Sequence, residues 1–372
     1  MLYQKKKKVL FVGSFKEASK DGSVGGQMFA CRTIINSKIS DSIDWTLLDT
    51  TADSNILASS FNRIRKASVR LFKFIYYIIL YKYDYVLIFT GGGWSFWEKG
   101  VMSLIAKKLS RGKVILAPQS GHVISDLNDN VRLSRFISFV FGKVDVVICQ
   151  SKFWETLFKQ IAPRGYKTEF VIIENIIDFD KYAGLPVRRL EKDEKVTILF
   201  MAWVTRNKGI FELIEAIKLL KAKKLKFNLI IAGKGDDYEI IKGYVENSGL
   251  SDCVELKGWI KGDEKFRLLA NSDIFVLPTY FEGYPNSLME AMASGKACIA
   301  TDVSSIPDMI ENNVNGILIQ QRNHFQLFEA LEFLIENPDI RYRMSLNARE
   351  SIKKTNSSNI IINKYRTLFQ CS

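Results

Sequence analysis

The chain has 372 residues and a mass of 42.5 kDa, more than a single hydrophobic core comfortably supports, so two domains are expected. Hydrophobic residues make up 47% and charged residues 25%, which excludes a disordered chain, a collagen-like repeat and a multispanning membrane protein. The net charge is +13, and residues 1–180 alone hold 26 Lys and Arg against 16 Asp and Glu. This first half therefore suits an acidic partner, namely nucleic acid, an anionic membrane surface or a phosphorylated small molecule.

The cysteines and apolar runs indicate a reduced, cytoplasmic protein. The five cysteines are scattered and form no C-x-x-C pair, which favours neither a disulfide framework nor a zinc site. The apolar run Val9–Val12 is too short for the core of a secretory signal, and Phe74–Leu80 is too short to span a bilayer. We therefore expect no membrane-spanning segment.

Two series of short apolar runs alternate with longer amphipathic or polar stretches. The first series is Val9–Val12, Trp45–Leu48, Tyr85–Phe89, Val114–Leu116, Val144–Cys149 and Phe170–Ile173. The second series is Val196–Met201, Asn228–Ala232, Cys253–Leu256, Ile274–Pro278, Ala297–Thr301 and Gly316–Ile319. Such runs are typical of buried parallel strands joined by helices, and residues 210–220 show the helical i, i+3, i+4, i+7 pattern.

The pattern predicts an α/β protein with two doubly wound, Rossmann-like domains. We expect an N-terminal domain over 1–182, a polar linker over 183–195 and a second domain over 196–344. Residues 345–372 are expected to form a C-terminal helix that packs back on the first domain. Ligands of such sheets bind at the carboxyl ends of the strands, so the site is expected between the domains.

The segment from Pro278 to Gly295 is the most informative part of the sequence. A loop follows the strand that ends near Pro278, and Pro285 suits the first turn of the next helix. Helix N-termini offer unpaired N–H groups, so residues 283–287 are a candidate cradle for a phosphate or a sugar hydroxyl. Glu282 and Glu290 flank this cradle and can accept hydrogen bonds from a polyol, although two solvated surface acids would look the same.

In its wider context, this segment closely resembles the retaining glycosyltransferases of family 4, which have the GT-B fold. The match rests on Glu282, seven intervening residues and Glu290, together with Ala297–Asp302, Ile306-Pro307-Asp308 and Asn315-Gly316. The resemblance covers almost the whole chain and is strongest over 196–319. It implies two facing Rossmann-like domains, a nucleotide-sugar donor held mainly by the second, no metal ion, no cofactor, and transfer with retention of anomeric configuration.

The resemblance also implies roles for individual residues of the second domain. Glu290 would accept the ribose hydroxyls of the donor, Glu282 would bind hydroxyls of the donor sugar, and the amides of Gly283, Tyr284, Pro285, Asn286 and Ser287 would serve the sugar and the diphosphate. Lys208 matches the family lysine that neutralises the departing diphosphate, which is a sound role for a fixed cation where charge develops.

One position of this pattern departs from the family. Many relatives have an arginine five residues before that lysine, where this chain has Trp203. Arg206 is the nearby candidate for the second cation.

Two further loops of the second domain follow predicted strands. Gly233 and Gly235 let a ligand approach the backbone, although Tyr238 stands where a complete dinucleotide fingerprint needs a third glycine, so NAD is not expected. In the resembled family this loop lies beside the nucleotide base, and Trp259 and Ile260 occupy another base-contacting position. On spacing alone, an ordinary turn is as good an interpretation of each loop as a binding loop.

In the first domain, Gly25 and Gly26 precede an apolar helix and match the family's Gly-Gly loop, which reaches toward the diphosphate and acceptor. Taken alone, such a loop is more often only flexible. His122 follows the strand Val114–Leu116, and the resemblance makes it a substrate contact near the anomeric carbon of the donor sugar.

Residues 61–80 interleave basic and apolar side chains. The basic ones are Arg63, Arg65, Lys66, Arg70 and Lys73. This composition suits a helix on the surface of an anionic membrane, and equally a solvated helix that packs one face on a sheet. The membrane interpretation would place the protein on the inner face of the plasma membrane, where lipid-linked acceptors lie.

The sequence therefore favours a metal-independent, retaining glycosyltransferase that acts on a glycan or lipid-linked acceptor in cell-surface polysaccharide or glycolipid biosynthesis. A nucleotide-sugar epimerase of the same fold would bind the donor without an acceptor. A catalytically silent homologue is a further alternative, for which Trp203 is the hint. A basic nucleic-acid-binding protein fits the charge, but no zinc-ligand or RNA-binding signature accompanies it, so no nucleic acid is expected as a partner.

Overall fold

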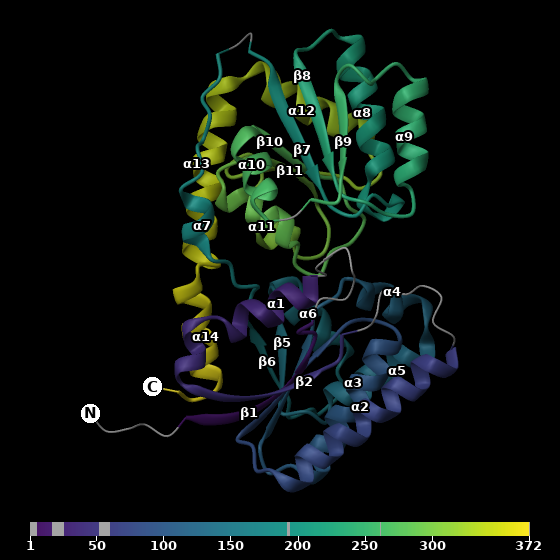
Figure 1. Cartoon of the computed structure of the whole chain (residues 1–372), viewed down its shortest axis with the longest axis vertical. Coiled ribbons are helices and arrows are strands. Elements are labelled where there is room, and N and C mark those ends of the chain that lie inside the picture. Colours follow the sequence, from purple (N-terminus) through teal and green to yellow (C-terminus); the bar gives the residue numbers. More distant parts are fainter. Residues whose placement is uncertain (1–5, 17–25, 52–59, 192–193, 261, 372) are drawn as a thin grey trace, which may run out of the picture. The chain divides into compact units, whose positions relative to one another are not determined.

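The computed structural model describes residues 6–16, 26–51, 60–191, 194–260 and 262–371. The chain divides into two compact units, shown in Figure 1. Unit 1 comprises residues 1–176 and 358–372, and unit 2 comprises residues 177–357. None of the helices in the described ranges is both long and apolar enough to cross a membrane.

Unit 1 is built on a parallel six-stranded sheet of order β2-β1-β3-β4-β5-β6. Its strands are β1 (Lys7–Gly13), β2 (Ile43–Asp49), β3 (Tyr85–Thr90), β4 (Lys113–Pro118), β5 (Val146–Cys149) and β6 (Glu169–Ile172). Its helices are α1 (Gly26–Ile35), η1 (Lys38–Asp41), α2 (Ser60–Leu80), α3 (Trp94–Leu109), α4 (His122–Asp129), α5 (Val131–Phe141), α6 (Lys152–Ile161) and α14 (Ser358–Leu368).

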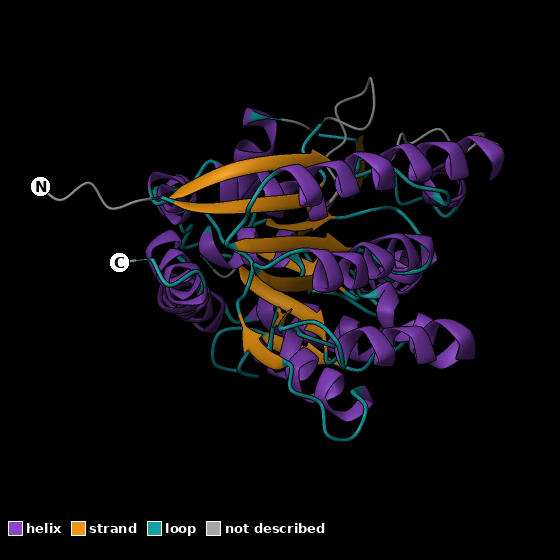
Figure 2. Ribbon diagram, turned by 90° about the horizontal axis from the view of Figure 1, so that it is seen from below, coloured by secondary structure: helices purple, strands orange, loops and turns teal. Residues whose placement is uncertain are grey.

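Both faces of this sheet are covered by helices, as Figure 2 shows. One core joins strand residues to α2, α3, α5 and α6, through side chains such as Phe74, Phe96 and Phe141. The core on the other face includes Cys31 of α1 and Tyr365 of α14. Because both faces are buried, the inner strands β3 and β5 are apolar runs in which every residue is buried.

Unit 2 repeats this architecture with a parallel sheet of order β12-β11-β10-β7-β8-β9. Its strands are β7 (Val196–Met201), β8 (Phe227–Ala232), β9 (Val254–Gly258), β10 (Ile274–Leu277), β11 (Ala297–Thr301) and β12 (Ile317–Ile319). Its helices are α7 (Phe179–Ala183), η2 (Arg206–Lys208), α8 (Ile210–Ala222), α9 (Tyr238–Asn247), α10 (Asp263–Asn271), α11 (Asn286–Ala293), η3 (Ile306–Asp308), α12 (His324–Glu336) and α13 (Pro338–Thr355).

The predicted α/β class and both doubly wound sheets are confirmed. Every apolar run of the two predicted series is a strand, and the ends differ by no more than two residues. The helix predicted over 210–220 is α8, whose apolar positions Leu213, Ile214 and Ile217 are fully or almost fully buried.

The polar segment expected as a linker over 183–195 belongs to unit 2, because the division lies between Ile176 and Ile177. The segment supplies backbone oxygens to two cations: the buried Lys296 donates from Nζ to Pro186 O at 3.0 Å, and the half-buried Arg349 donates to Leu185 O at 2.6 Å. Leu190 is buried in the core of the unit. Part of this segment therefore packs on unit 2 through its backbone oxygens and Leu190.

The end of the chain is shared between the units. Residues 345–355 continue α13 in unit 2, and the chain returns to unit 1 at Ser358. In unit 1 the Phe369 ring lies 5.1 Å from that of Tyr85 and 6.0 Å from that of Trp45, between ring centroids. Lys364 of α14 forms an ion pair with Glu174. The last helix thus completes the core of unit 1.

Candidate active site

The residues predicted in unit 2 lie on loops at the carboxyl ends of its parallel strands. Lys208 follows β7, Gly233 follows β8, Trp259 follows β9 and Glu282 follows β10. These four strands are consecutive in the sheet, in the order β10-β7-β8-β9. The fold therefore gathers residues that are up to 74 positions apart at one edge, where α/β sheets bind ligands.

Lys208 and Glu282 form an ion pair with 2.5 Å between Nζ and Oε1. Both side chains are largely buried, with exposed fractions of 23% and 12%. The two loops are also tied through the backbone, since Tyr280 N donates to Asn207 O at 2.9 Å. The cation and the carboxylate are thus held together by the loops that carry them.

Gly209 explains how these loops approach so closely. It ends η2 with φ of 70°, and a Cβ placed there would lie 1.9 Å from Pro278 O. A side chain would collide with the backbone at the start of the β10 loop. Only glycine permits both this backbone conformation and this contact.

Glu290 lies on α11 and is 5% exposed. Its Oε1 accepts hydrogen bonds from Lys265 Nζ at 2.7 Å and from Tyr182 Oη at 2.9 Å. Burial, followed by the Glu290 charge, raises the pKa of Tyr182 well above its ordinary value, so its hydroxyl keeps its proton and donates. The Lys265 ammonium balances the negative charge of the buried carboxylate.

The start of α11 differs in detail from the sequence expectation. Pro285 is the residue before the first turn, and α11 begins at Asn286. Because proline has no N–H, Pro285 cannot donate to a ligand, and the amide cradle expected over 283–287 contains four donors rather than five. The Tyr284 side chain is buried and bonded to Asn356, with 3.1 Å from Oη to Oδ1, so it is part of the core.

The loops after β7, β8 and β9 are joined by aromatic and glycine contacts. The rings of Trp203 and Trp259 lie 5.1 Å apart at an interplanar angle of 46°, and Trp203 is 47% exposed. A Cβ on Gly233 would lie 1.9 Å from Ala202 O, and one on Gly235 would lie 2.4 Å from Val204 O. These glycines therefore serve the packing of the β8 loop against the β7 loop.

Two other predicted residues of this edge have structural partners. The Arg206 guanidinium lies 4.4 Å from the centre of the Phe211 ring, and its backbone N–H donates to Asp237 Oδ2 at 2.6 Å. Ile260 is half-buried and packs against the core of unit 2. The structure thus holds Arg206 over the start of α8.

Unit 1 carries the remaining predicted residues at the carboxyl edge of its own sheet. Gly26 is the first residue of α1, and Gly25 lies outside the described residues. His122 is exposed and begins α4 after β4. A Cβ on Gly92 would lie 3.0 Å from His122 Cβ, so the loop after β3 packs tightly on this helix start.

Three residues of these sites were not found by sequence analysis. Tyr182 and Lys265, the partners of Glu290, lie 108 and 25 positions from it and belong to no recognisable motif. In unit 1, Asp126 Oδ2 accepts a hydrogen bond from Gly93 N at 2.6 Å and so fixes the loop beside His122. No local pattern marks these residues, because only the fold brings them to their partners.

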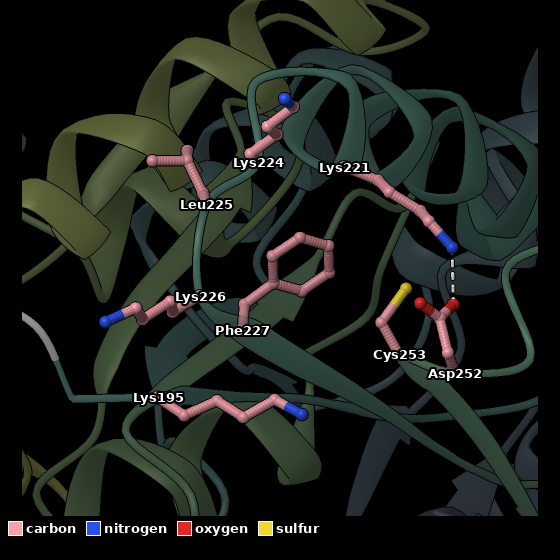
Figure 3. Close-up of a pocket in the computed structure, with 8 residues that line it drawn as sticks. All are labelled: Lys195, Lys221, Lys224, Leu225, Lys226, Phe227, Asp252 and Cys253. Atoms are coloured by element: carbon pink, nitrogen blue, oxygen red, sulfur yellow. Dashed lines mark hydrogen bonds and ion pairs between the residues drawn. The ribbon is translucent and has the colours of Figure 1, made fainter.

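Unit 2 also has a basic pocket of about 400 Å³, drawn in Figure 3, at the amino ends of three of its strands. It is lined by Lys195, Lys221, Lys224, Leu225, Lys226, Phe227, Asp252 and Cys253. Lys195, Phe227 and Cys253 stand at or just before the amino ends of β7, β8 and β9. The pocket is therefore separate from the loops that carry the predicted residues.

Comparisons with known proteins show what the chain is similar to. Residues 186–351 match the family described as "Glycosyl transferases group 1". The chain is 38% identical over 131 residues to the amylovoran biosynthesis glycosyltransferase AmsK of Erwinia amylovora, covering 34% of this chain and 32% of that protein. It is 31% identical over 190 residues to the N,N'-diacetylbacillosaminyl-diphospho-undecaprenol alpha-1,3-N-acetylgalactosaminyltransferase of Campylobacter jejuni, covering 49% and 46%. These matches thus span a third to a half of the two relatives.

The fold is similar to that of a solved structure over nearly the whole chain. HepE of Anabaena, in complex with UDP-glucose, gives a TM-score of 0.73 at 17% identity and covers 98% of this chain and 100% of that chain. The two sheets therefore have the GT-B arrangement of strands and helices.

Proposed function

We propose that this chain, whose residues 186–351 match the family described as "Glycosyl transferases group 1", transfers a sugar from a nucleoside diphosphate sugar to a hydroxyl group of a glycan or lipid-linked acceptor. The transfer retains the anomeric configuration and uses neither a metal ion nor a cofactor. The observation that carries the proposal is the Lys208–Glu282 ion pair at the carboxyl edge of unit 2, on the same edge as Glu290.

The donor nucleotide is assigned to the carboxyl edge of unit 2. A buried carboxylate such as Glu290 is a strong acceptor for the two adjacent hydroxyls of a ribose. Lys265 and Tyr182 hold the carboxylate in place, and the Lys265 charge offsets the cost of its burial. Trp203 and Trp259 supply aromatic faces on the neighbouring loops, where a nucleobase can stack.

Lys208 is assigned to the diphosphate. When the bond between the sugar and the phosphate breaks, its electron pair goes to the phosphate oxygen, and negative charge develops there. An ammonium group has three N–H donors, and the ion pair with Glu282 uses one of them. A cation that is already fixed where this charge develops lowers the barrier without a metal ion.

Glu282 and the unit 1 residues are assigned to the reacting sugars. Glu282 is assigned to hydroxyls of the donor sugar, and its ion pair with Lys208 supports a sugar site beside the diphosphate site. On the family resemblance, we assign Gly25 and Gly26 to the diphosphate and the acceptor, and His122 to the region of the anomeric carbon. The acceptor hydroxyl attacks on the face that the phosphate leaves, and the departing phosphate oxygen takes its proton, which balances the reaction without a protein base.

The acceptor class is supported by the relatives. The name of the Campylobacter protein describes a sugar linked through a diphosphate to undecaprenol, and AmsK is named for the biosynthesis of the polysaccharide amylovoran. We therefore assign the chain to polysaccharide or glycolipid biosynthesis. A lipid-linked acceptor places the protein at the cytoplasmic face of a membrane, as a peripheral protein.

A thermal-shift panel tests the proposal. UDP, GDP and ADP are each added to the purified protein, with a single-stranded oligonucleotide as the comparison, and UDP is tried first because HepE was solved with UDP-glucose. One nucleoside diphosphate is expected to raise the melting temperature. Stabilisation by the oligonucleotide and by none of the diphosphates would contradict the assignment.

A further inference from the structure

One side of α2 is apolar and exposed to solvent. Val69, Phe72, Tyr76, Ile79 and Leu80 have exposed fractions between 54% and 74%. Their spacing of three and four residues places them on one side of the helix. The opposite side holds the buried Phe74 and Ile78, so the exposed side chains are not those that attach α2 to the core.

The packing of unit 1 fixes the orientation of this exposed side. Arg70 forms two hydrogen bonds with Glu98 of α3, of 2.6 Å from Nε and 3.0 Å from Nη2. Figure 1 shows α2 and α3 lying side by side. Arg70 therefore attaches α2 to α3. This contact fixes the rotation of α2, so its apolar side chains remain on the solvent side.

The charges on α2 are all positive. The helix contains basic residues and no Asp or Glu. Arg65 precedes Val69 by four residues and so lies in line with the apolar side chains, while Lys66 and Lys73 border them, and all three are exposed. A second copy of this helix would bring cation against cation, whereas an anionic surface complements both the charge and the apolar side chains.

Tyrosines at the end of the helix strengthen this preference. Tyr76 and Tyr81 are about half exposed, and ring contacts connect Tyr76 to Tyr77 and Tyr77 to Tyr81 at 6.1 Å each. Lys73 Nζ lies 5.6 Å from the centre of the Tyr77 ring. Tyrosine has an apolar ring and a polar hydroxyl, and it gathers at the boundary between lipid and water.

We propose that this surface, which we call the α2 stripe and define as Arg65, Val69, Phe72, Tyr76, Ile79 and Leu80, docks onto the surface of an anionic lipid bilayer. The apolar side chains enter the boundary between headgroups and acyl chains, and Arg65, Lys66 and Lys73 bind lipid phosphates. The α2 stripe is narrower than the 61–80 segment predicted from the sequence. The proposal goes beyond the transferase function and does not depend on it.

The apolar part is tested by sedimentation with vesicles made of equal parts phosphatidylcholine and phosphatidylglycerol. The variant Phe72→Ser/Ile79→Ser is expected to bind about 100-fold more weakly than the wild type, because two large apolar side chains are lost from the contact. The matched control is Ile240→Ser/Phe325→Ser, which removes two similarly exposed apolar side chains of unit 2. Equal loss in both variants would overturn the proposal.

The charged part is tested with the variant Arg65→Gln/Lys66→Gln/Lys73→Gln. Its binding to the same vesicles is expected to fall about 100-fold, and wild-type binding is expected to weaken as salt is added. Wild-type binding to vesicles of phosphatidylcholine alone is expected to be weak. Equal binding to both kinds of vesicle would overturn the role of the cations.

A tryptophan at the centre of the α2 stripe reports insertion directly. Fluorescence of the Phe72→Trp variant is expected to be quenched by vesicles with brominated acyl chains, and that of Phe325→Trp is not. If light scattering shows that the wild type is a dimer which Phe72→Ser/Ile79→Ser converts to a monomer, and no vesicle binding occurs, the stripe is an interface between copies and the proposal is wrong. Circular dichroism and the temperature of thermal unfolding check that each variant is folded, and neither readout depends on membrane or nucleotide binding.

Discussion

At the residue scale, the predicted site charges Lys208, Glu282 and Glu290 of unit 2 each lie against an opposite charge. Glu282 holds Lys208, and Lys265 with Tyr182 holds Glu290. These groups lie in a largely buried environment, where an unpaired charge is expensive. The pairs therefore keep the binding groups in fixed positions before any ligand arrives.

Replacing Lys208 by methionine is expected to lower kcat by about 100- to 1,000-fold, because the cation acts on charge that develops during the reaction. The KM for the donor is expected to change much less. Steady-state kinetics with the identified donor measures both constants. The control is Lys242→Met, which removes an exposed lysine of α9, and an equal loss in the two variants would refute the role of Lys208.

Lys296 gives unit 2 a pH-dependent stability. It is 1% exposed and donates to Ser272 O and Pro186 O at 3.0 Å each, and burial lowers its pKa from 10.5 to about 8. Above that pH the folded state has released this proton while the unfolded state keeps it, so the unfolded state binds more protons. The free energy of unfolding is therefore expected to rise with pH between about 8 and 10.

Urea denaturation at several pH values measures this effect. The difference in the free energy of unfolding between the wild type and Lys296→Met is expected to change in favour of the wild type as the pH rises from 7 to 10. Parallel pH profiles for the two proteins would show that Lys296 does not titrate in this range.

At the scale of elements, the strands position the site and the loops give it its shape. The loops after β7 and β10 meet because Gly209 has no side chain, and a Cβ there would lie 1.9 Å from Pro278 O. Gly249 has a similar φ, 66° against 70°, but a Cβ at that position would meet nothing within 4 Å. Alanine at Gly249 therefore adds only backbone strain, whereas alanine at Gly209 adds the same strain and a collision.

Gly209→Ala is expected to destabilise unit 2 by about 3 kcal/mol or more, and Gly249→Ala by about 1 kcal/mol, because only the first adds a collision to the backbone strain. Hydrogen exchange of peptides from β7 and β10 measures the difference. Similar exchange in both variants would show that the β10 loop moves away at little cost.

The sequence predicted the strands better than the loops, for a physical reason. Strands such as β7 and β11 are buried on both faces, so their apolar runs are visible without an alignment. Glu282, Glu290 and Lys208 could be predicted from their resemblance to a family motif. Tyr182 and Lys265 could not, because a partner chosen by tertiary contact leaves no pattern along the chain.

At the scale of the whole molecule, the C-terminal residues belong to unit 1 although they follow unit 2 in the sequence. Unit 1 is completed by α14, which follows all of unit 2 in the sequence. Phe369 is fully buried in a cluster with Tyr85 and Trp45. The sequence predicts one helix over 345–372 that packs back on the first domain, whereas in the structure residues 345–355 extend α13 of unit 2 and only α14 packs in unit 1.

Phe369→Ala is expected to destabilise unit 1 by about 3 kcal/mol through the cavity it leaves, with little effect on unit 2. Hydrogen exchange resolved by peptide measures the two units separately: faster exchange is expected in β1 and β3, and unchanged exchange in β7 and β10. Phe325→Ala, at an exposed position of α12, is the control. Faster exchange in both units would contradict the division of the chain.

Part of the excess positive charge of the chain lies on one helix of unit 1. Part of the positive excess in residues 1–180 comes from α2, which has no acidic residues and whose exposed side is apolar. The predicted donor site lies in unit 2. We therefore assign membrane attachment to unit 1 and nucleotide binding to unit 2. Each assignment can fail without the other.

The central claim is that the carboxyl edge of unit 2 binds a nucleoside diphosphate through Glu290. Calorimetric titration with UDP, or with whichever diphosphate stabilises the protein most, tests it in the wild type, in Glu290→Gln and in the exposed-surface control Glu246→Gln. Loss of charged hydrogen bonds is expected to weaken binding to Glu290→Gln by about 10- to 100-fold, with the control unchanged. Equal affinity of Glu290→Gln and the wild type would contradict the account.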